Sequence, residues 1–524
     1  MAQPAVIILA AGEGTRMKSA LPKVLHRIAG RTLLHHAIAA AQALDPARIV
    51  VVVRHGRDQV AAEALRLAPA ALVVDQDEIP GTGRAVQCAL AAMDQAGVQA
   101  GGGIVVMPGD TPLLDGQVLV ALAERHQASG AAVTVLTASL AEPFGYGRIV
   151  REPGNQDLVA GIVEERDATA EQRAITEVNS SVYVFEPDVL RRGLSRVGRD
   201  NAQGEVYLTD VVGLARGEGA AAVALAWPDP LVILGVNSRV QLAQAAAAYN
   251  RHLTTQAMVG GVTILDPATT WLDADVVLQP DVTLLPGCHL AGHTTVAGGA
   301  VVGPFTTLTD CEVGAGAKVD RVVALQAVIG QDANVGPFTY LRPGTVLGRG
   351  AKAGSYTELK AATIGDGAKV PHLSYVGDAV VGEGANIGAG TIFANYDGVN
   401  KARSEVGPAA RVGSNSVVVA PVYIGAGAYT GAGTVVRGDV PPGSLAVTAG
   451  SLRVIEGWTG RKRPGTDSAE QATRAERAQA AVRELAEQTA QHRAASAVTG
   501  DPVEDPGQAA LDQGGPGGHT GTGD

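Results

Sequence analysis

Residues 329–353 read IGQDANVGPFTYLRPGTVLGRGAKA. An aliphatic side chain stands at every sixth position of this stretch: Ile329, Val335, Leu341, Leu347 and Ala353. The same spacing returns later in the chain, with one threonine among the aliphatic residues: Val406, Val412, Val418, Ile424, Thr430 and Val436. A glycine directly follows many of these positions, as expected of a chain that turns tightly and often.

A period of six separates this half of the chain from helices and ordinary strands. An α-helix repeats its apolar positions every 3.6 residues and a strand every two. A chain that turns a corner every six residues forms a triangular coil of roughly eighteen residues, with one aliphatic side chain per side pointing inward. The pattern therefore predicts a β-helix of about ten coils. It begins after Gly261, is regular from Val296 and ends near Val436.

The six-residue, or hexad, pattern is interrupted by a shift of one residue at two places, which we call phase slips. They lie near Leu359–Ile364 and near Val399–Val406. We expect a solenoid to expel such irregularities as loops, and loops carry function more often than coils do. These two places are therefore where a site in the solenoid is expected.

Residues 1–237 have a different organisation, because short apolar runs alternate with Ala- and Leu-rich helical stretches. The runs have the length of buried strands: Val6–Leu9, Ile49–Val53, Ala71–Val74, Ile104–Met107 and Ala132–Leu136. Such alternation favours a parallel, Rossmann-like α/β sheet. Apolar positions along one face make Ser238–Met258 a linking helix. The sequence thus predicts an α/β domain (1–237), a linking helix (238–260), a β-helix (261–458) and a C-terminal tail (459–524).

The C-terminal tail differs in composition from both domains. Ser468–Arg493 is rich in Ala, Glu, Gln and Arg, so we expect it to be partly helical. Ala494–Asp524 consists largely of Gly, Pro, Asp and Thr, with little to bury, so we expect disorder there. No activity is assigned to this tail.

Composition limits the possible partners. The 524 residues carry a net charge of -11 and no basic stripe, which argues against nucleic acid or an anionic membrane as a general partner. The apolar start, Ala5–Ala11, is too short for a membrane span and lacks a basic segment before it, so we interpret it as a buried strand. Three widely spaced cysteines (Cys88, Cys288 and Cys311) suit a reducing compartment. A cytoplasmic location is the simplest expectation.

A Gly-rich loop, Leu9–Met17, follows the first strand. Gly12 and Gly14 allow backbone N–H groups to approach phosphate oxygens, and we expect the start of a following helix to add positive potential. The segment is neither a dinucleotide fingerprint nor a Walker loop, and alone it could be a plain tight turn. Arg16 and Lys23 favour the phosphate interpretation, because two nearby cations could neutralise a triphosphate.

Asp110 follows the apolar strand Ile104–Met107, at the edge where an α/β sheet opens its ligand crevice. A carboxylate there suits Mg²⁺ that bridges phosphates. A helix N-cap is the alternative role for this aspartate. Asn237 stands before the linking helix and could cap it.

Several segments of the first domain together carry a family resemblance. They are Leu9–Met17 with Pro22-Lys23, Gln76 before Gly81-Thr82-Gly83, Gly109-Asp110, Gly145–Ile149, Ile162–Glu164 and Gly235–Asn237. In order and spacing they resemble the sugar-1-phosphate nucleotidyltransferases, most closely the uridyltransferase half of the bifunctional GlmU family, which makes UDP-N-acetylglucosamine. The resemblance implies a substrate site built from Leu9, Ala10, Ala11, Gly12, Arg16, Lys23, Gln76, Gly81, Thr82, Asp110, Gly147, Glu164, Asn179 and Asn237.

The resemblance also implies a role for each part of this site. Arg16 and Lys23 would hold the triphosphate of UTP, and Gln76, Gly81 and Thr82 would read uracil. The sugar of N-acetylglucosamine-1-phosphate would contact Gly147, Glu164 and Asn179. Asp110 and Asn237 would bind Mg²⁺.

Polar residues concentrate between Arg342 and Tyr396 in the solenoid: Arg342, Lys360, His372, Tyr375, Asn386, Asn395 and Tyr396. Polar residues on coil faces are usually solvated, and a lone His372 could be a plain surface residue. A neutral histidine can also take a proton from an amine that attacks a thioester. In that interpretation Arg342 and Lys360 hold a sugar phosphate and Glu358 orients the imidazole.

The strings Pro371–Asp378, Asn386–Thr391 and Asn395–Gly398 resemble the acetyltransferase half of the same family, a left-handed parallel β-helix. The resemblance implies His372 as general base, with Arg342, Lys360, Tyr375 and Asn386 around glucosamine-1-phosphate. Acetyl-CoA would contact Ala389, Asn395, Tyr396, Ser414 and Ala432. Family members associate as homotrimers that share this site. One departure from the family is Ala449, which occupies the place of an arginine that binds CoA phosphates in many members. Arg453 or the run Arg461–Arg463 could substitute for that arginine. Trp458 could pack on the cofactor or on the coil edge.

Three functional hypotheses follow. The first is a two-site enzyme that acetylates glucosamine-1-phosphate with acetyl-CoA and then transfers uridylate from UTP to the product. The alternative is a nucleotidyltransferase whose solenoid only trimerises or regulates. A third is a protein that binds sugar nucleotides without turnover. His372, together with Arg342 and Lys360, favours the first, since a scaffold needs none of them.

Overall fold

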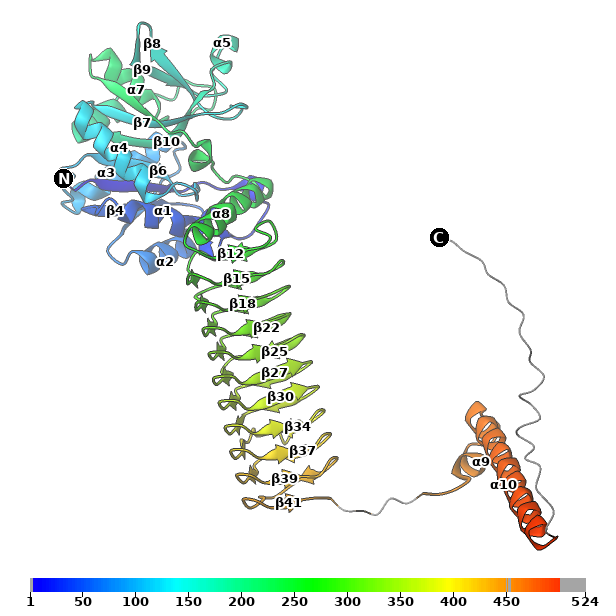
Figure 1. The fold of residues 1–524 in the computed structure, drawn as a ribbon. Helices are drawn as coiled ribbons and strands as arrows, with labels where there is room; N and C mark the ends of the chain where they lie inside the picture. Colours follow the sequence, from blue (N-terminus) through cyan, green and yellow to red (C-terminus); the bar gives the residue numbers. More distant parts are fainter. Residues whose placement is uncertain (1–2, 449, 451–453, 500–524) are drawn as a thin grey trace, which may run out of the picture. The chain divides into compact units, whose positions relative to one another are not determined.

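A computed structural model describes residues 3–448, 450 and 454–499 (Figure 1). The contacts within the chain divide it into two compact units, Met1–Thr448 and Ala449–Asp524. None of the helices in the described residues combines the length and the hydropathy that crossing a membrane requires.

A mixed sheet forms the centre of the N-terminal domain. Its strand order is β5-β4-β1-β6-β10-β7-β11-β9-β8. The strands are β1 Ala5–Ala10, β4 Arg48–Val53, β5 Leu72–Asp75, β6 Ile104–Pro108, β7 Val133–Ser139, β8 Arg148–Glu152, β9 Asn155–Val163, β10 Glu177–Phe185 and β11 Ala222–Ala226. A small two-stranded sheet pairs β2 Arg27–Ile28 with β3 Arg31–Thr32.

Only part of the main sheet is parallel. Strands β5, β4, β1 and β6 pair in parallel, as predicted, and so do β7 and β11. Strand β10 separates these groups and runs antiparallel to both β6 and β7. The five predicted strands all run in the same direction, as expected, but the unpredicted strand β10 lies antiparallel between the fourth and the fifth.

Helices cover both sides of this sheet because side chains alternate along its central strands. Val6 and Ile8 pack in a buried cluster with α1 Leu33–Gln42, α2 Arg57–Leu67 and α4 Gly116–Ser129. Ile7 packs on the opposite side with α3 Thr82–Gln95, α6 Pro187–Leu194 and α7 Asp210–Gly217. The remaining short helices are η1 Thr15–Met17, η2 Lys23–Leu25, α5 Ala170–Arg173 and η3 Pro230–Ile233.

The predicted linking helix is α8, Arg239–Val259. Its N-cap is Ser238, whose hydroxyl accepts a hydrogen bond from the Gln241 N–H. Asn250 connects the helix to the first coil, because its side chain donates to Thr270 O at 2.7 Å and accepts from Leu272 N at 3.0 Å. The pair Arg31–Asp275, whose partners are both partly buried, also joins the N-terminal domain to the first coil.

Three sheets of parallel strands form the β-helix, as the hexads predict, and its coils follow one another from β12 to β41 in Figure 1. The first face contains β12 Thr263–Ile264, β15 Thr283–Leu284, β18 Val301–Val302, β21 Lys318–Val319, β24 Asn334–Val335, β27 Lys352–Ser355, β30 Lys369–His372, β33 Asn386–Ile387, β36 Arg411–Val412, β39 Tyr429–Thr430 and β41 Leu445–Ala446. The second face contains β13 Trp271–Leu272, β16 His289–Ala291, β19 Thr307–Thr309, β22 Val322–Leu325, β25 Thr339–Leu341, β28 Glu358–Lys360, β31 Tyr375–Gly377, β34 Ile392–Ala394, β37 Val417–Val419 and β40 Val435–Val436. The third face contains β14 Val277–Leu278, β17 Thr295–Val296, β20 Glu312–Val313, β23 Val328–Ile329, β26 Val346–Leu347, β29 Thr363–Ile364, β32 Ala379–Val381, β35 Ser404–Val406 and β38 Tyr423–Ile424.

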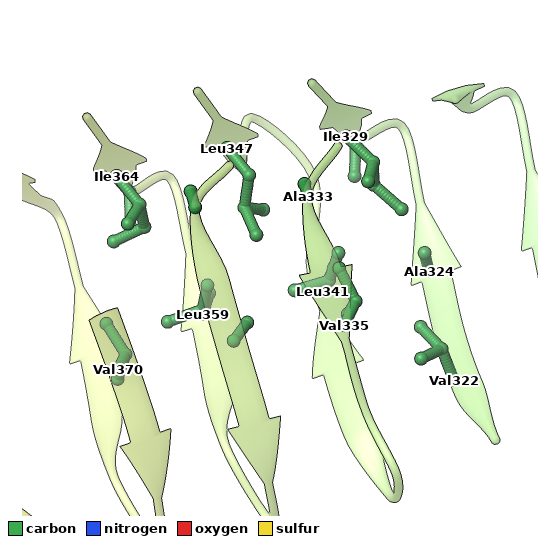
Figure 2. Close-up of a cluster of buried hydrophobic side chains, with 14 of the residues drawn as sticks. Val322, Ala324, Ile329, Ala333, Val335, Leu341, Leu347, Leu359, Ile364 and Val370 are labelled. Carbon is green, nitrogen blue, oxygen red and sulfur yellow. The ribbon is translucent and has the colours of Figure 1, made fainter. Parts of the chain in front are cut away.

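The hexad side chains fill the interior of the coils. Every one of the predicted inward positions, from Ile329 to Ala353 and from Val406 to Val436, is buried. In Figure 2, Ile329, Leu347 and Ile364 from the third face point toward side chains from the other two faces. The coils also continue beyond the last predicted position, since β41 pairs with β39.

The two predicted phase slips have different structural causes. The coil that contains Leu359–Ile364 is one residue shorter than the first coil. Val346 pairs with Thr363, 17 residues on, whereas Val277 pairs with Thr295, 18 residues on. Both Leu359 and Ile364 stay fully buried, so the prediction of a loop was wrong there. At the second slip Val381 pairs with Val406, 25 residues on. The extra residues leave the coil as a loop after β34, in which Tyr396 and Lys401 form a bridge.

The second unit contains α9 Trp458–Lys462 and α10 Asp467–Thr499. Helix α10 includes the segment predicted to be helical and also continues through residues 494–499, for which disorder was predicted wrongly. Alanine is frequent there, and its high helix propensity explains the extension. The rest of the expected disordered segment, 500–524, lies outside the described residues.

Candidate active sites

A cleft of about 780 Å³ opens in the N-terminal domain at the ends of β1 and β6. All fourteen residues of the predicted first site line it: Leu9, Ala10, Ala11, Gly12, Arg16, Lys23, Gln76, Gly81, Thr82, Asp110, Gly147, Glu164, Asn179 and Asn237. These residues are distant in sequence, and the fold brings them to one edge of the sheet.

The loop after β1 leaves open space on one side and packs against Lys23 on the other. No atom lies within 4 Å of where a Gly12 side chain would begin, so the backbone is accessible to a ligand there. Gly14 has a φ of 68°, and a Cβ on it would lie only 2.7 Å from Lys23 Cβ. The loop is followed by one 3₁₀ turn, Thr15–Met17, and not by an α-helix. The expected contribution of a helix start was therefore wrong, and positive charge must come from Arg16 and Lys23.

Lys23 lies between the two residues expected to bind metal. Its ammonium forms an ion pair with the Asp110 carboxylate and donates to Asn237 Oδ1 at 2.9 Å. Neither expected metal ligand is a helix cap, because α4 is capped by Asp115 and α8 by Ser238. The alternative structural roles considered for Asp110 and Asn237 are thus taken by their neighbours.

The donor set fits a hard divalent cation. An Asp carboxylate and an Asn amide oxygen converge on one cation, here the Lys23 ammonium. Mg²⁺ prefers oxygen donors and commonly takes only one or two from the protein, with water and phosphate supplying the others. No group of three His, Cys, Asp or Glu residues suited to a metal occurs among residues 3–448, 450 and 454–499. A metal bound at Asp110 would therefore depend on phosphate oxygens.

The expected uracil-reading residues form a turn before α3. Gln76 Nε2 donates to Ile79 O at 3.0 Å and to Gly81 O at 3.3 Å. Gly81 has a φ of 121°, and a Cβ there would collide with the Val206 backbone. Thr82 begins α3, and its hydroxyl accepts from Leu208 N at 3.2 Å. The turn is thus fixed on both sides of Gly81.

The expected sugar-binding residues are Gly147 in the loop before β8, Glu164 directly after β9, and Asn179 in β10. A register shift follows Asn179 in β10. Its amide donates to Tyr183 Oη at 2.7 Å. Glu164 accepts from Thr209 Oγ1 at 3.2 Å, and burial raises the pKa of this carboxyl group. Gly147 lies against both, because a Cβ on it would be 3.5 Å from Asn179 Cβ and from Glu164 Oε2.

Sequence reasoning missed a buried ion pair behind the sugar side of the cleft. Arg148 is 2% exposed, and its guanidinium donates to Glu165 Oε2 at 2.7 Å and to Tyr146 O. Glu165 also accepts from Gly145 N at 3.1 Å. Burial would raise the pKa of Glu165, but the hydrogen bonds from Gly145 and Arg148 lower it. The sequence signal was an arginine between Gly147 and the apolar pair Ile149-Val150.

In the β-helix, the residues expected around acetyl-CoA follow one corner. His372 ends β30, and its carbonyl accepts from Gly390 N. Ala389 O accepts from Asn415 N in turn, and Ser414 O accepts from Gly433 N. His372, Ala389, Ser414 and Ala432 therefore occupy equivalent positions on successive coils. The His372 side chain is exposed, and its ring has no hydrogen bond or ion pair within the described part of the chain.

The second face carries the cations expected near glucosamine-1-phosphate. Lys360 Nζ donates to Asp378 at 2.9 and 3.2 Å, and Asn395 donates to the same carboxylate. Burial would raise the pKa of Asp378, but hydrogen bonds from Lys360 and Asn395 lower it. Tyr375 lies nearby, because a Cβ on Gly377 would collide with its hydroxyl and with Asn395. Sequence reasoning gave Asp378 no role, although it lies in the quoted string Pro371–Asp378.

Glu358 does not orient the imidazole, contrary to expectation. Its carboxylate accepts from Arg342 Nη1 at 3.0 Å and stands on the second face, whereas His372 ends a strand of the first. The structure thus gives Glu358 a role in holding Arg342.

The remaining expected residues belong to different parts of the chain. Asn386 begins β33 and pairs with Lys369 of the same strand as His372. Tyr396 is 58% exposed in the loop, and its hydroxyl donates to Gly398 O at 2.5 Å. In the second unit, the Arg463 guanidinium lies 5.6 Å from the Trp458 ring. Ala449 and Arg453 lie outside the described residues.

Comparison with known proteins gives consistent matches over most of the chain. Residues 6–173 match the family model of the MobA-like NTP transferase domain. A bifunctional protein GlmU from Kineococcus radiotolerans is 58% identical over 471 residues, which cover 90% of this chain and 95% of that protein. The GlmU proteins of Paenarthrobacter aurescens and Streptomyces avermitilis are 53% and 52% identical over 90% of this chain, covering 94% and 97% of their own lengths. A solved UDP-glucose pyrophosphorylase, complexed with UDP-glucose, matches 48% of this chain and 99% of its own at 18% identity, with a TM-score of 0.38.

Proposed function

This chain belongs to the family of bifunctional GlmU proteins and is a transferase with a uridyltransferase and an acetyltransferase activity; from this premise we propose how its residues divide the two reactions. The β-helix transfers an acetyl group from acetyl-CoA to glucosamine-1-phosphate. The N-terminal domain then joins the product, N-acetylglucosamine-1-phosphate, to the uridylate of UTP and releases pyrophosphate.

The uridyl transfer takes place in the cleft of about 780 Å³. A phosphate oxygen of the sugar phosphate attacks the α-phosphorus of UTP, and the bond to the β-phosphate breaks, so no covalent protein intermediate is required. The backbone of Leu9–Gly12, together with Arg16 and Lys23, holds the triphosphate. Asp110 and Asn237 hold Mg²⁺, which neutralises phosphate charge when bound.

Recognition of the two substrates uses different parts of the cleft wall. The uracil lies against the turn of Gln76, Gly81 and Thr82, whose backbone is held by the contacts with Val206 and Leu208. The sugar lies against Gly147, Glu164 and Asn179. The Arg148–Glu165 pair supports this wall, since it joins the loop before β8 to the end of β9.

The acetyl transfer takes place on the β-helix, where His372 ends a strand of the first face and where Arg342 and Lys360 stand at the ends of strands of the second face. The amine of glucosamine-1-phosphate attacks the thioester carbonyl, His372 accepts a proton from the amine, and CoA leaves as the thiolate. Arg342, Lys360, Tyr375 and Asn386 hold the sugar phosphate. Acetyl-CoA follows the corner along Ala389, Ser414 and Ala432, beside Asn395 and Tyr396. Exposure of the His372 ring supports this assignment, because a general base must reach substrate.

We assign the uridyl transfer to residues 1–237 and the acetyl transfer to residues 261–458, with 238–260 as a linking helix and 459–524 as a tail.

We also propose a homotrimer. Exposed apolar side chains support it, because Phe305, Phe338, Tyr356 and Leu373 are each more than half exposed and share a left-handed backbone position on their coils. The rings of Phe338 and Tyr356 stack at 5.3 Å. Small-molecule substrates and three free cysteines suit the cytoplasm.

The observation that carries this proposal is the separation of the two residue sets. One lines the cleft of the sheet domain, and the other lies on the first two faces of the solenoid and in the corners and loop that follow their strands. The test supplies the full-length protein with one substrate pair at a time. We expect CoA thiol release with acetyl-CoA and glucosamine-1-phosphate, and pyrophosphate release with UTP and N-acetylglucosamine-1-phosphate. Pyrophosphate release without any thiol release would favour a nucleotidyltransferase with a scaffold, and absence of both would favour a binding protein.

A further inference from the structure

We propose that Lys23 has two working positions: before nucleotide binds, its ammonium occupies the oxygen atoms of Asp110 and Asn237, and the triphosphate draws it away. The divalent metal then enters with the nucleotide and not before it. This inference rests on the proposed uridyl-transfer site and adds an order of binding to it.

The contacts of Lys23 carry the first step. Its ammonium contacts both expected metal ligands, pairing with the Asp110 carboxylate and donating to Asn237 Oδ1 at 2.9 Å. The Lys23 and Asp110 side chains are only 13% and 15% exposed, so the pair is largely shielded from water. A cation is therefore already present at these oxygen atoms.

The same oxygen atoms cannot serve lysine and metal together. Mg²⁺ binds oxygen at about 2.0–2.1 Å. An ammonium donating to the same two oxygen atoms would place both cations within a few ångströms, and their repulsion is strong where water is largely excluded. Metal binding to the nucleotide-free cleft must therefore break the Lys23–Asp110 pair, and the displaced ammonium then needs another anionic partner.

The nucleotide supplies that partner. The Lys23 stem packs against Gly14, in the loop expected to hold phosphates, since a Cβ on Gly14 would lie 2.7 Å from Lys23 Cβ. Space beside Gly12 is open. A change of side-chain rotamers would carry the ammonium from carboxylate to phosphate while the backbone of η2 stays in place. The released carboxylate then binds the metal that the phosphates bring.

Arg16 offers a matched control. It is exposed, it lines the same cleft, and it has no hydrogen bond or ion pair within the described residues. Replacing Arg16 removes one positive charge from the cleft without freeing Asp110. Lys23→Met removes one charge and frees Asp110, while it keeps much of the aliphatic stem.

The experiment measures Mn²⁺ binding to the full-length, nucleotide-free protein by electron paramagnetic resonance. We expect Lys23→Met to bind Mn²⁺ at least tenfold more tightly than the wild type, and Arg16→Met to gain much less. Equal Mn²⁺ affinity of Lys23→Met and wild type would overturn the proposal, as would an equal gain in Arg16→Met. If Lys23→Met fails to fold, Lys23→Gln is measured in the same way.

A second arm separates this inference from the metal assignment itself. A UTP analogue with a methylene group between the α- and β-phosphorus atoms should strengthen Mn²⁺ binding in the wild type, and Asp110→Asn should weaken it. If Asp110→Asn binds Mn²⁺ with the analogue as well as the wild type does, the metal assignment fails. If only the Lys23→Met result is negative, the assignment stands and the two-position model falls.

Discussion

Replacing Arg148 tests whether the sugar side of the uridyltransferase cleft is held from behind by one buried ion pair. The guanidinium is 2% exposed and joins Glu165 Oε2, at 2.7 Å, to the carbonyl of Tyr146. Arg148→Met removes both hydrogen bonds and keeps most of the stem volume. Glu165 then retains Gly145 N at 3.1 Å and Arg173 at 3.8 Å.

The expected magnitude follows from what is lost and what remains. A hydrogen bond to a charged group contributes about 1.5–3 kcal/mol, and breaking a buried pair costs about 3–5 kcal/mol. Glu165 is 19% exposed and keeps a second donor, so the lower end applies, at about 2 kcal/mol. If that free energy appears as disorder of the loop that carries Gly147, the KM for N-acetylglucosamine-1-phosphate should rise by about 10- to 100-fold.

The assay is pyrophosphate release at varied sugar phosphate and saturating UTP. Arg173→Met is the control, because Arg173 pairs with the same Glu165 carboxylate but is about half exposed, and exposed pairs contribute about 0–1 kcal/mol. We expect a raised KM in Arg148→Met, little change in Arg173→Met and normal acetyl transfer in both. A wild-type KM in folded Arg148→Met would refute the reasoning, as would an equal rise in both variants.

Three further predictions concern the acetyltransferase corner, the pH dependence and the coil interior. Asp378→Asn should lower thiol release by about tenfold or more, because Lys360 and Asn395 lose a shared charged acceptor; Asp366→Asn, whose partner Arg349 is mostly exposed, should not. Burial raises the pKa of Glu164, so the folded protein favours the neutral carboxyl group. The folded protein therefore loses stability as the pH rises from the usual pKa of a glutamate through the raised pKa of Glu164. Glu164→Gln should therefore have a higher free energy of unfolding in urea than the wild type at pH 8. If the difference between variant and wild type stays constant from pH 8 down to about pH 4, this prediction is contradicted. Leu341→Ala should destabilise the β-helix by about 2–5 kcal/mol in urea unfolding, since Leu341 is fully buried; Val346→Ala, at an outward position, should cost much less, and equal losses would count against the inward assignment.

The β-helix was predictable because one inward side chain per six residues leaves a strong pattern. Val335 and Leu341 needed only their spacing to be placed inside. The second phase slip was informative because an insertion must leave the coil, whereas the first was misread because a coil can absorb a one-residue deletion. In the N-terminal domain the buried parallel strands were visible as apolar runs. Strand β9, Asn155–Val163, was not, because its first three residues are polar and exposed.

The site was predictable as a set of residues but not as a set of contacts. The sequence placed Lys23, Asp110 and Asn237 near one another, but it could not show that the ammonium lies on both oxygen ligands. Glu358 was assigned to the wrong partner because sequence proximity does not reveal which face a side chain occupies. Arg148 was missed because its burial depends on strands that were not foreseen.

The central claim, that two independent modules carry the two reactions, is tested most directly by measuring both activities on the same preparations of Asp110→Ala and His372→Ala. We predict that folded, full-length Asp110→Ala loses pyrophosphate release and keeps thiol release, and that His372→Ala does the reverse. Loss of both activities in either folded variant would contradict the account.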